Sequence, residues 1–268
     1  MDEPLLADGR GWSRRAFVKG CVLGTAAGLA ATAAGAGLAS LTPPLGSLRR
    51  VDYLGNTVSQ DPAPQGLPLL ALRADARGDL WADADPGGIE GDVLDWYKYC
   101  GHERTRGLQR TFRPEDEHLR YFLTPEKAHT IAEGWYLDRL GQVANAAHFE
   151  RRGMGASVQW RSQGMTGTDI ITAIVLRVDP ASLSFHQAPE EVVRSRFLAP
   201  APDGDVLIGY VSFCKHFCCV PGWRESPTAR ERGFWEDIFC TCHASAYDPR
   251  RIRSDYFLLR VPREESAA

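Results

Sequence analysis

Short runs of apolar residues recur along most of the chain, and they are rich in Leu, Ile and Val, as half-buried or buried β-strands are. The runs cover residues 67–73, 169–178, 206–213, 238–239 and 256–261. Two of these runs lead directly into segments that contain cysteine and histidine. The pattern predicts a mainly β domain in which strands carry functional loops at their ends.

Residues 88–160 follow a different pattern. Thr124, Pro125 and Glu126 place a capping hydroxyl, a proline and an acid in order, as at the start of a helix. Apolar residues then recur at the spacing of one helix face, at Ala128, Ile131, Ala132, Trp135, Tyr136 and Leu140. A second helix is expected at residues 89–99. We therefore predict a largely helical insertion at about residues 88–160 of the β-domain.

A long uncharged stretch lies near the N-terminus, where no charged residue occurs from Gly20 to Leu48. Its core, residues 21–41, is mostly Ala and Gly and is long enough to span a hydrocarbon layer as a helix. We expect a transmembrane anchor at residues 20–42. Cleavage at a small-residue site such as Ala34-Gly35-Ala36 is the alternative.

A twin-arginine pattern precedes this stretch, in Ser13-Arg14-Arg15-Ala16-Phe17-Val18-Lys19. Such a signal is a receptor-read address for export, and residues 1–19 form its basic region. Basic residues before the anchor predict that the N-terminus stays in the cytoplasm. The C-terminal domain is then expected on the outer face of the cytoplasmic membrane, attached by a single pass, where a disulfide can persist.

Composition narrows the remaining possibilities. The 268 residues allow one anchor and one sizeable domain. Residues 43–66 contain Gly55, Pro62, Pro64 and Gly66 with polar neighbours, and they are predicted to form a linker. The net charge of −3 does not indicate a nucleic-acid partner. The chain has no nucleotide-binding loop, nucleophile elbow or His-Glu-x-x-His motif, so its chemistry is expected where cysteine and histidine gather.

Cysteine and histidine gather in two short boxes near the C-terminus, Cys214-Lys215-His216-Phe217-Cys218-Cys219-Val220-Pro221 and Cys240-Thr241-Cys242-His243-Ala244-Ser245-Ala246-Tyr247-Asp248. They supply one Cys-x-His pair and one Cys-x-x-His pair. Two thiolates can hold one iron of a [2Fe–2S] cluster and two imidazoles the other, an arrangement that raises the reduction potential. Each box also keeps a further cysteine, Cys219 and Cys242, and these two can join as a disulfide in an oxidising compartment.

The boxes resemble those of the Rieske iron–sulfur proteins of quinol–cytochrome c and b6f-type complexes. In that family Cys-x-His-x-x-Cys is followed by Cys-x-Cys-His-x-Ser-x-Tyr, and this chain matches every one of these positions. The resemblance implies the cluster ligands Cys214, His216, Cys240 and His243 and the disulfide Cys219–Cys242. It also implies a Rieske-type antiparallel β-domain over residues 67–264 with a cluster-binding subdomain at about residues 206–250. The predicted helical insertion lies within this domain, and the resemblance does not cover it.

The resemblance further assigns roles to residues around the cluster. Ser245 would donate a hydrogen bond to a bridging sulfide and Tyr247 to a cysteine sulfur, and such donors raise the potential. His243 would be the catalytic ligand that meets quinol. Phe217 and Pro221 would help form an apolar tip that docks on cytochrome b.

Two features depart from the usual family pattern, and the resemblance also gives the linker a role. Ala244 stands where the family usually has glycine. The segment between His216 and Cys240 has 23 residues, more than is common. In the family the linker, here residues 43–66, is a hinge that lets the cluster domain swing between two docking sites.

We therefore expect an electron-transfer subunit of a respiratory chain, carrying one [2Fe–2S] cluster in a membrane-bound, quinol-oxidising bc-type complex. The chain alone is an electron carrier, and its partners would be a cytochrome b-type subunit, quinol, and a cytochrome c or copper-protein acceptor. The alternative is the Rieske small subunit of an exported oxidoreductase such as arsenite oxidase, which has no quinol contact and needs no hinge.

A zinc-binding structural module is a third possibility, because Cys and His at short spacing also form tetrahedral zinc sites. A zinc ribbon has no use for Ser245 and Tyr247 at their offsets, nor for an extra cysteine in each box. A purely disulfide function leaves His216 and His243 without a role.

Overall fold

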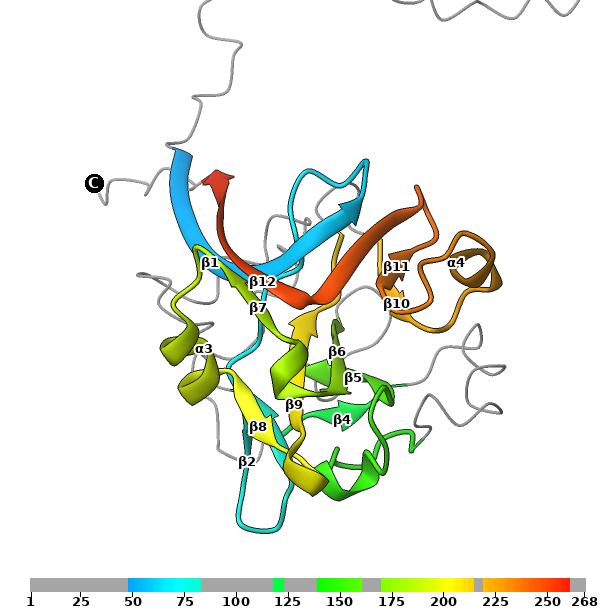
Figure 1. The fold of residues 1–268 in the computed structure, drawn as a ribbon. Helices are drawn as coiled ribbons and strands as arrows, with labels where there is room; N and C mark the ends of the chain where they lie inside the picture. The colour runs from blue at the N-terminus through cyan, green and yellow to red at the C-terminus, as the bar shows by residue number, and fades with distance from the viewer. Residues whose placement is uncertain (1–47, 83–117, 123–138, 161–169, 215–218, 261–268) are drawn as a thin grey trace, which may run out of the picture. The chain divides into compact units, whose positions relative to one another are not determined.

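The computed structural model describes residues 48–82, 118–122, 139–160, 170–214 and 219–260 (Figure 1). The export signal at residues 1–19 and the predicted anchor at residues 20–42 lie outside these ranges. Within the described ranges, no helix is long and apolar enough to cross a membrane.

The described part of the chain is mainly β, as the apolar runs predict, and its strands form two five-stranded sheets and a hairpin. The first sheet has the order β1 (Leu48–Gln60), β12 (Ser245–Arg260), β11 (Ile238–Cys240), β10 (Gly222–Trp223), with β7 (Ser184–His186) parallel to β12. The second sheet has the antiparallel order β4 (Arg120–Tyr121), β5 (Gly155–Trp160), β6 (Ile171–Val178), β9 (Val206–Val211), β8 (Leu198–Pro200).

Smaller elements complete the described structure. The strands β2 (Leu72–Ala74) and β3 (Leu80–Ala82) form the hairpin. Helices α3 (Glu190–Arg196) and α4 (Pro227–Glu231) are short, and single 3₁₀ turns lie at Ala146–His148, Pro180–Ser182 and Pro202–Gly204. Helical structure is therefore confined to connections in this part of the chain.

The predicted strands correspond to observed ones with different boundaries. The runs at 169–178, 206–213 and 238–239 become β6, β9 and β11. The run at 256–261 is only the end of β12, which extends over 16 residues. In the run at 67–73, only the last two residues belong to a regular strand, although Pro68 and Leu69 make isolated bridges to Gly55 and Tyr210.

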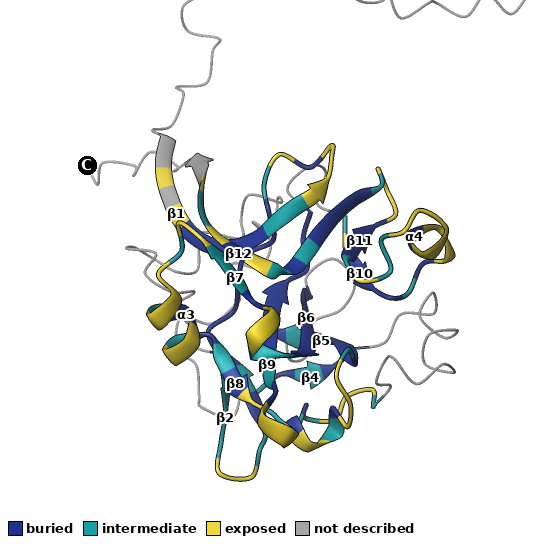
Figure 2. Ribbon diagram, viewed as in Figure 1, coloured by how far each residue is buried: buried dark blue, intermediate teal, exposed yellow. Residues whose placement is uncertain are grey.

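The second sheet is buried on both faces, because an apolar cluster lies on each side of it (Figure 2). Every residue of β6 is buried. Its alternate residues divide between the clusters, with Ala173 and Val175 in one and Ile174 and Leu176 in the other. A strand buried on both faces has a continuous apolar run, which is why this segment could be predicted. The cluster that holds Ile174 and Leu176 also contains side chains of the first sheet, and it joins the two sheets.

The predicted linker at residues 43–66 is wrong for most of its length. Residues 48–60 are β1, which pairs with β12 from Leu48 to Gln60 with register shifts after Asn56 and after Val58. The next segment folds back onto β1, where Leu67 donates its N–H to the side chain of Asn56 (2.7 Å) and accepts the N–H of Asn56 at its own carbonyl (3.1 Å). The chain thus enters the domain as a strand of the first sheet.

The glycines of this segment serve close packing. A Cβ at Gly55 would lie 2.6 Å from the carbonyl oxygen of Leu67, and a Cβ at Gly66 would overlap the carbonyl oxygen of Asn56. Glycine inside strands often marks such a close approach of two backbones. The same residue type also marks flexible turns, so the sequence pattern could not separate the two cases.

The predicted helical insertion at residues 88–160 is also wrong where the structure describes it. Residues 155–160 form β5, an internal strand of the second sheet, and residues 120–121 form β4 beside it. Residues 139 and 140, the end of one predicted helix, are not helical. The rest of that helix and the helix predicted at 89–99 lie outside the described residues. Residues 155–160 form a strand because they pair with β6, and the helical spacing of residues 128–140 gives no information about that pairing.

Replacing Gly66 by alanine tests the corrected linker. Gly66→Ala should destabilise the domain by about 2–3 kcal/mol, because the added methyl group overlaps a backbone carbonyl that pairing holds in place. Gly209→Ala on β9 is the matched control, since a Cβ there would lie 3.4 Å from the Cβ of Leu70, an ordinary contact. Urea unfolding measures both variants. Equal free energies of unfolding for the two variants would contradict the close packing at Gly66 and would favour a flexible linker instead.

Candidate metal centre

Two buried cysteines meet where the two sheets adjoin. Cys214 follows the end of β9 by three residues, and Cys240 is the last residue of β11. Both are fully buried in the apolar cluster that joins the sheets. The hydrogen bond between the two thiols, together with burial, raises the pKa of Cys240 well above its usual range. Strands far apart in the sequence thus bring two sulfur ligands into contact.

Backbone hydrogen bonds shape the loop of the first box. Cys214 donates its N–H to the carbonyl of Cys219 (2.8 Å), which closes the loop, and Ser212 donates its hydroxyl to the carbonyl of Pro221. Residues 215–218 between the two ends lie outside the described residues, and His216 and Phe217 are among them. The loop is therefore anchored at both ends by β9 and by the start of β10.

The second box is the turn of the β11–β12 hairpin. Cys240 pairs with Ser245, so residues 241–244 form the connecting loop. Ala244 closes the loop with φ 60°, in the left-handed region that favours glycine. This accounts for the glycine that is usual at this position. Here the methyl group packs against a small apolar cluster that includes Phe239 and Ala246.

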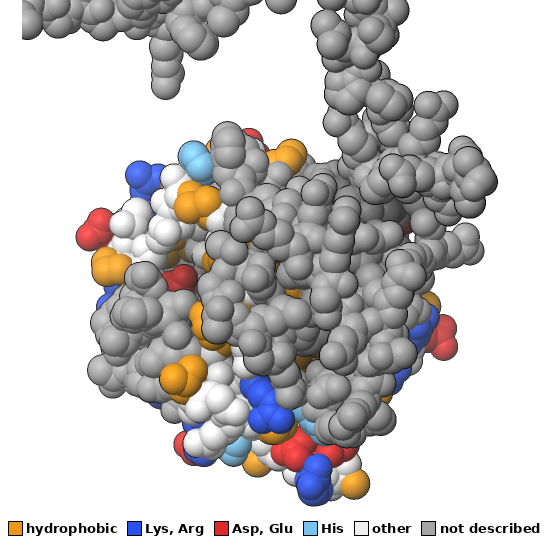
Figure 3. Space-filling view, turned by 180° about the vertical axis from the view of Figure 1, so that it is seen from behind, with side chains coloured by type: hydrophobic (Ala, Val, Ile, Leu, Met, Phe, Trp, Pro, Cys, Tyr) orange, Lys and Arg blue, Asp and Glu red, His pale blue; other side chains and the backbone are white. Residues whose placement is uncertain are grey.

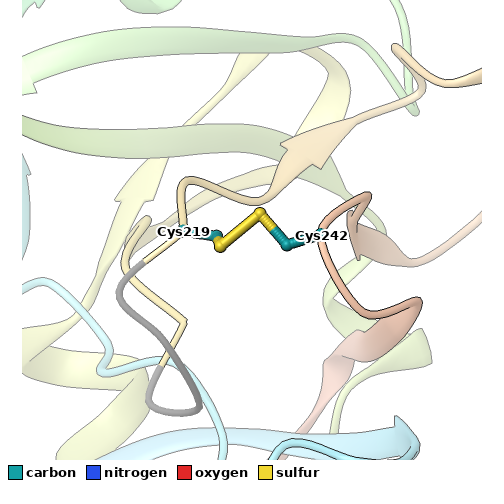
Figure 4. Close-up of a disulfide and its surroundings, with 2 residues drawn as sticks. All are labelled: Cys219 and Cys242. Atoms are coloured by element: carbon teal, nitrogen blue, oxygen red, sulfur yellow. A yellow bond between two sulfur atoms is a disulfide. The ribbon is translucent and has the colours of Figure 1, made fainter. Parts of the chain in front are cut away.

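A disulfide joins the two loops, between Cys219 and Cys242 (Figure 4). The Cα atoms lie 6.5 Å apart, inside the range that disulfides span. The structure therefore contains the pairing that the family resemblance implied. The sulfur of Cys240 lies within 4.8 Å of both bridged sulfurs. Because Cys219 and Cys242 are bridged, Cys214 and Cys240 are the box cysteines outside a disulfide among the residues that the structure describes.

Ser245 and Tyr247 lie on β12 directly behind the thiol pair. Ser245 is fully buried, and its hydroxyl oxygen accepts the N–H of Ala63 (3.1 Å), which orients the oxygen and leaves its proton to donate. Tyr247 is also fully buried, and its hydroxyl lies beside the side chains of Cys214 and Ser245. Burial and the nearby Cys214 raise the pKa of Tyr247 far above its usual value. A buried phenol close to two thiols fits a hydrogen-bond donor to sulfur.

The exposed part of the site differs from one sequence prediction. Pro221 is buried, so it does not form part of an apolar tip, whereas Val220 beside it is 43% exposed. His243 is exposed on the hairpin loop. A ring at that position can meet a molecule from solvent while the thiols remain covered.

The long segment between the boxes forms an additional cover on the hairpin. Residues 224–237 contain α4, and Ala229 of this helix packs with Phe239 and Phe234 beside the second box. The guanidinium group of Arg230 stacks on the ring of Trp235, 4.0 Å from its centroid. This connection accounts for the long spacing between the boxes. Neither it nor the Ala63 contact could be recognised from the cysteine spacing.

A second group of potential ligands lies on the β2–β3 turn, where Asp75 and Asp79 approach His118. Acidic and basic side chains gather at the lower edge of the molecule in Figure 3, the end from which this turn projects in Figure 1. The guanidinium group of Arg77 lies 3.4 Å from the carboxylate of Asp75 and 3.3 Å from that of Asp79. The single positive charge of Arg77 thus offsets part of the negative charge of these two acids, and the arrangement fits a structural turn.

Comparisons of the chain with models of known protein families, with curated proteins and with solved structures found no match. The chemistry of the centre is therefore argued from its own residues.

Breaking the disulfide tests how far it holds the two loops. Cys242→Ser should lower the free energy of unfolding by about 3 kcal/mol, because the cross-link no longer restricts the unfolded chain. Thermal unfolding with and without reductant measures this, and reduced wild-type protein should approach the variant. Thr241→Ser, on the same exposed loop, serves as the control. If reductant leaves the wild-type transition unchanged, the bridge does not contribute to stability.

Proposed function

We propose that the chain is an electron-transfer protein that holds a Rieske-type [2Fe–2S] cluster through Cys214, His216, Cys240 and His243. The observation that carries the proposal is the buried Cys214–Cys240 pair beside the Cys219–Cys242 disulfide. A zinc ribbon uses its cysteines as ligands, whereas here two of the four box cysteines that the structure describes are bridged to each other. The donor set that remains, two thiols and the two histidines of the boxes, is the mixed set of a Rieske centre.

The surrounding residues fit a group that carries negative charge on sulfur. Tyr247 has a buried hydroxyl beside Cys214 that can donate, and Ser245 has a hydroxyl proton that its Ala63 contact leaves available. Such a cluster would supply one-electron transfer at a raised potential. The apolar cluster around Cys214 and Cys240 excludes water from the sulfur side. His243 is exposed, so a molecule from solvent can reach its ring.

By the family resemblance, the donor is quinol, and its site is shared with a cytochrome b-type subunit. His243 would accept the quinol proton, and a cytochrome c or copper protein would take the electron. The segment at residues 20–42 would anchor the chain in the cytoplasmic membrane, with the domain on the outer face.

A second candidate function is electron relay in an exported oxidoreductase of the arsenite-oxidase kind. One specific observation favours it: β1 begins at Leu48 and pairs with β12 along its length. The hinge of bc-type complexes needs a flexible stretch, and the strand occupies most of the residues predicted for it. A relay between fixed centres needs no such hinge.

Two hydroxyl variants test the cluster. The isolated protein should contain iron and labile sulfide. Tyr247→Phe and Ser245→Ala should each lower the midpoint potential of the cluster. A lost hydrogen bond to charged sulfur is worth about 1.5–3 kcal/mol, or about 60–130 mV for one electron. The control is Tyr121→Phe, which should leave the potential unchanged. Tyr121 is a buried phenol of the second sheet, and its hydroxyl is hydrogen-bonded to His148. Absence of iron after anaerobic isolation, or unchanged potentials in both variants, would end the proposal.

Paramagnetic resonance of reduced membranes distinguishes the two candidate functions. A quinol-site inhibitor should shift the Rieske signal if His243 meets quinol, because the inhibitor occupies the same pocket. A copurifying cytochrome b supports the same conclusion. An unchanged signal together with a copurifying molybdenum subunit would favour the relay.

A further inference from the structure

A segment outside the two boxes reaches the candidate centre. Residues 61–66, which we call the exit segment, follow β1 directly. Ala63 of this segment is 3% exposed and belongs to the same apolar cluster as Cys214 and Cys240. Its backbone N–H donates to the hydroxyl oxygen of Ser245 (3.1 Å), 182 positions further along the chain. The surroundings of the thiol pair therefore include a backbone donor that neither box supplies.

The sequence of the exit segment leaves one backbone donor at this point. Pro62 and Pro64 flank Ala63, and proline has no N–H. Both prolines are exposed, whereas Ala63 between them is buried. Prolines also restrict the unfolded chain, so ordering this segment costs less conformational entropy. The exit segment is thus suited to present a single N–H at a fixed position.

Hydrogen bonds to the first sheet hold the exit segment on both sides. At its far end, Tyr53 on β1 donates its hydroxyl to the carbonyl of Gly66 (3.1 Å). Just before it, Ser59 donates its hydroxyl to the carboxylate of Asp237 (2.6 Å), the residue that precedes β11. The position of the Ala63 N–H is therefore set by contacts on either side of the segment.

Ser245 lies between this N–H and the sulfur atoms. It is directly opposite Cys240 in the β11–β12 pair, so the two side chains are on one face of the sheet. The hydroxyl of Tyr247 lies beside Ser245 and Cys214. A serine hydroxyl has one proton and two acceptor lone pairs. Because the Ala63 N–H occupies an acceptor position, the Ser245 proton is kept for donation in another direction.

The Ala63 contact changes the Ser245 hydroxyl in two ways. It restricts rotation, because turning the hydroxyl proton toward Ala63 would place two hydrogens against each other. It also polarises the O–H bond, since hydrogen bonds in a chain strengthen one another where the local dielectric is low. Both effects favour donation to sulfur that carries negative charge, as it would in a reduced cluster.

We propose that Ala63 is a positioning residue, whose backbone N–H fixes the Ser245 hydroxyl as a donor to the cluster sulfur. The reduction potential then depends on the exit segment as well as on the two boxes. This role rests on the proposed function and applies to both candidate functions, because it concerns the potential and not the partner. Since the exit segment continues β1, the strand by which the chain enters the domain is coupled to the potential of the centre.

A double-mutant cycle on the midpoint potential of the full chain tests this role. Ala63→Pro removes the N–H, and Pro64 already biases residue 63 toward extended conformations that proline can adopt. It should lower the potential in the same direction as Ser245→Ala and by a smaller amount. In the Ser245→Ala background it should cause no further shift, because the hydroxyl through which Ala63 acts is gone. Pro64→Ala, exposed in the same segment, is the matched control and should leave the potential unchanged.

Hydrogen exchange measures the same contact independently of the potential. Because Pro62 and Pro64 have no amide, a peptide over residues 61–65 contains few amides and resolves that of Ala63. Ser245→Ala should make this amide exchange about fivefold faster, the effect of losing about one hydrogen bond. Tyr121→Phe in the second sheet is the control and should leave the exchange unchanged.

The outcomes separate this role from the function on which it rests. Absence of iron and labile sulfide from the wild-type chain contradicts the cluster and, with it, the role of Ala63. With the cluster present, the role alone is contradicted by a raised or unchanged potential in Ala63→Pro, by equal shifts in the two backgrounds, or by unchanged exchange of the Ala63 amide in Ser245→Ala. If Ala63→Pro does not fold, an ester bond between residues 62 and 63 removes the same hydrogen and takes its place in the cycle.

Discussion

The pairing of β12 with its neighbours is the constraint on which the rest of the structure depends. One continuous strand of 16 residues pairs with β1 along its length, with β11 at its start and with β7 at its middle. Because side chains alternate along a strand, a shift of one residue would turn Ser245 and Tyr247 away from the thiol pair. The register therefore places the donors of the candidate centre, and it does so with backbone hydrogen bonds that no substitution at the site alters.

The centre itself lies where two sheets contribute one cysteine each. Burial of Cys214 and Cys240 in an apolar cluster keeps water from the sulfur atoms, and the same burial requires that charge on sulfur be met by donors. Tyr247 and Ser245 supply these donors from the strand behind. The disulfide and the backbone bonds of the first loop hold the remaining side, and His243 lies on the exposed hairpin loop. With the proposed cluster in place, such an arrangement would separate a dry side that carries the electron from a wet side that can exchange protons.

The entry of the chain into the domain changes how electron transfer would be organised. The strand β1 occupies most of the residues that the sequence predicted as a hinge. In the relay of the second candidate function the acceptor would have to reach the exposed face of the centre, whereas a hinged domain would carry the cluster to its acceptor.

Local spacing was enough to identify the candidate ligands, because Cys-x-His and Cys-x-Cys-His place their donors within one loop whatever the fold around them. The continuous apolar run of β6 likewise reports burial on both faces, a property of the segment itself. The sequence prediction was wrong at Gly55 and Gly66 and at residues 155–160. The glycines make close backbone contacts and residues 155–160 pair with β6, and in both cases the partner lies in another segment of the chain. Only the tertiary structure decided that Cys214 meets Cys240, that Ala63 orients Ser245 and that β1 replaces a linker. Each of these depends on hydrogen bonds or packing between distant segments, whose energies no local pattern records.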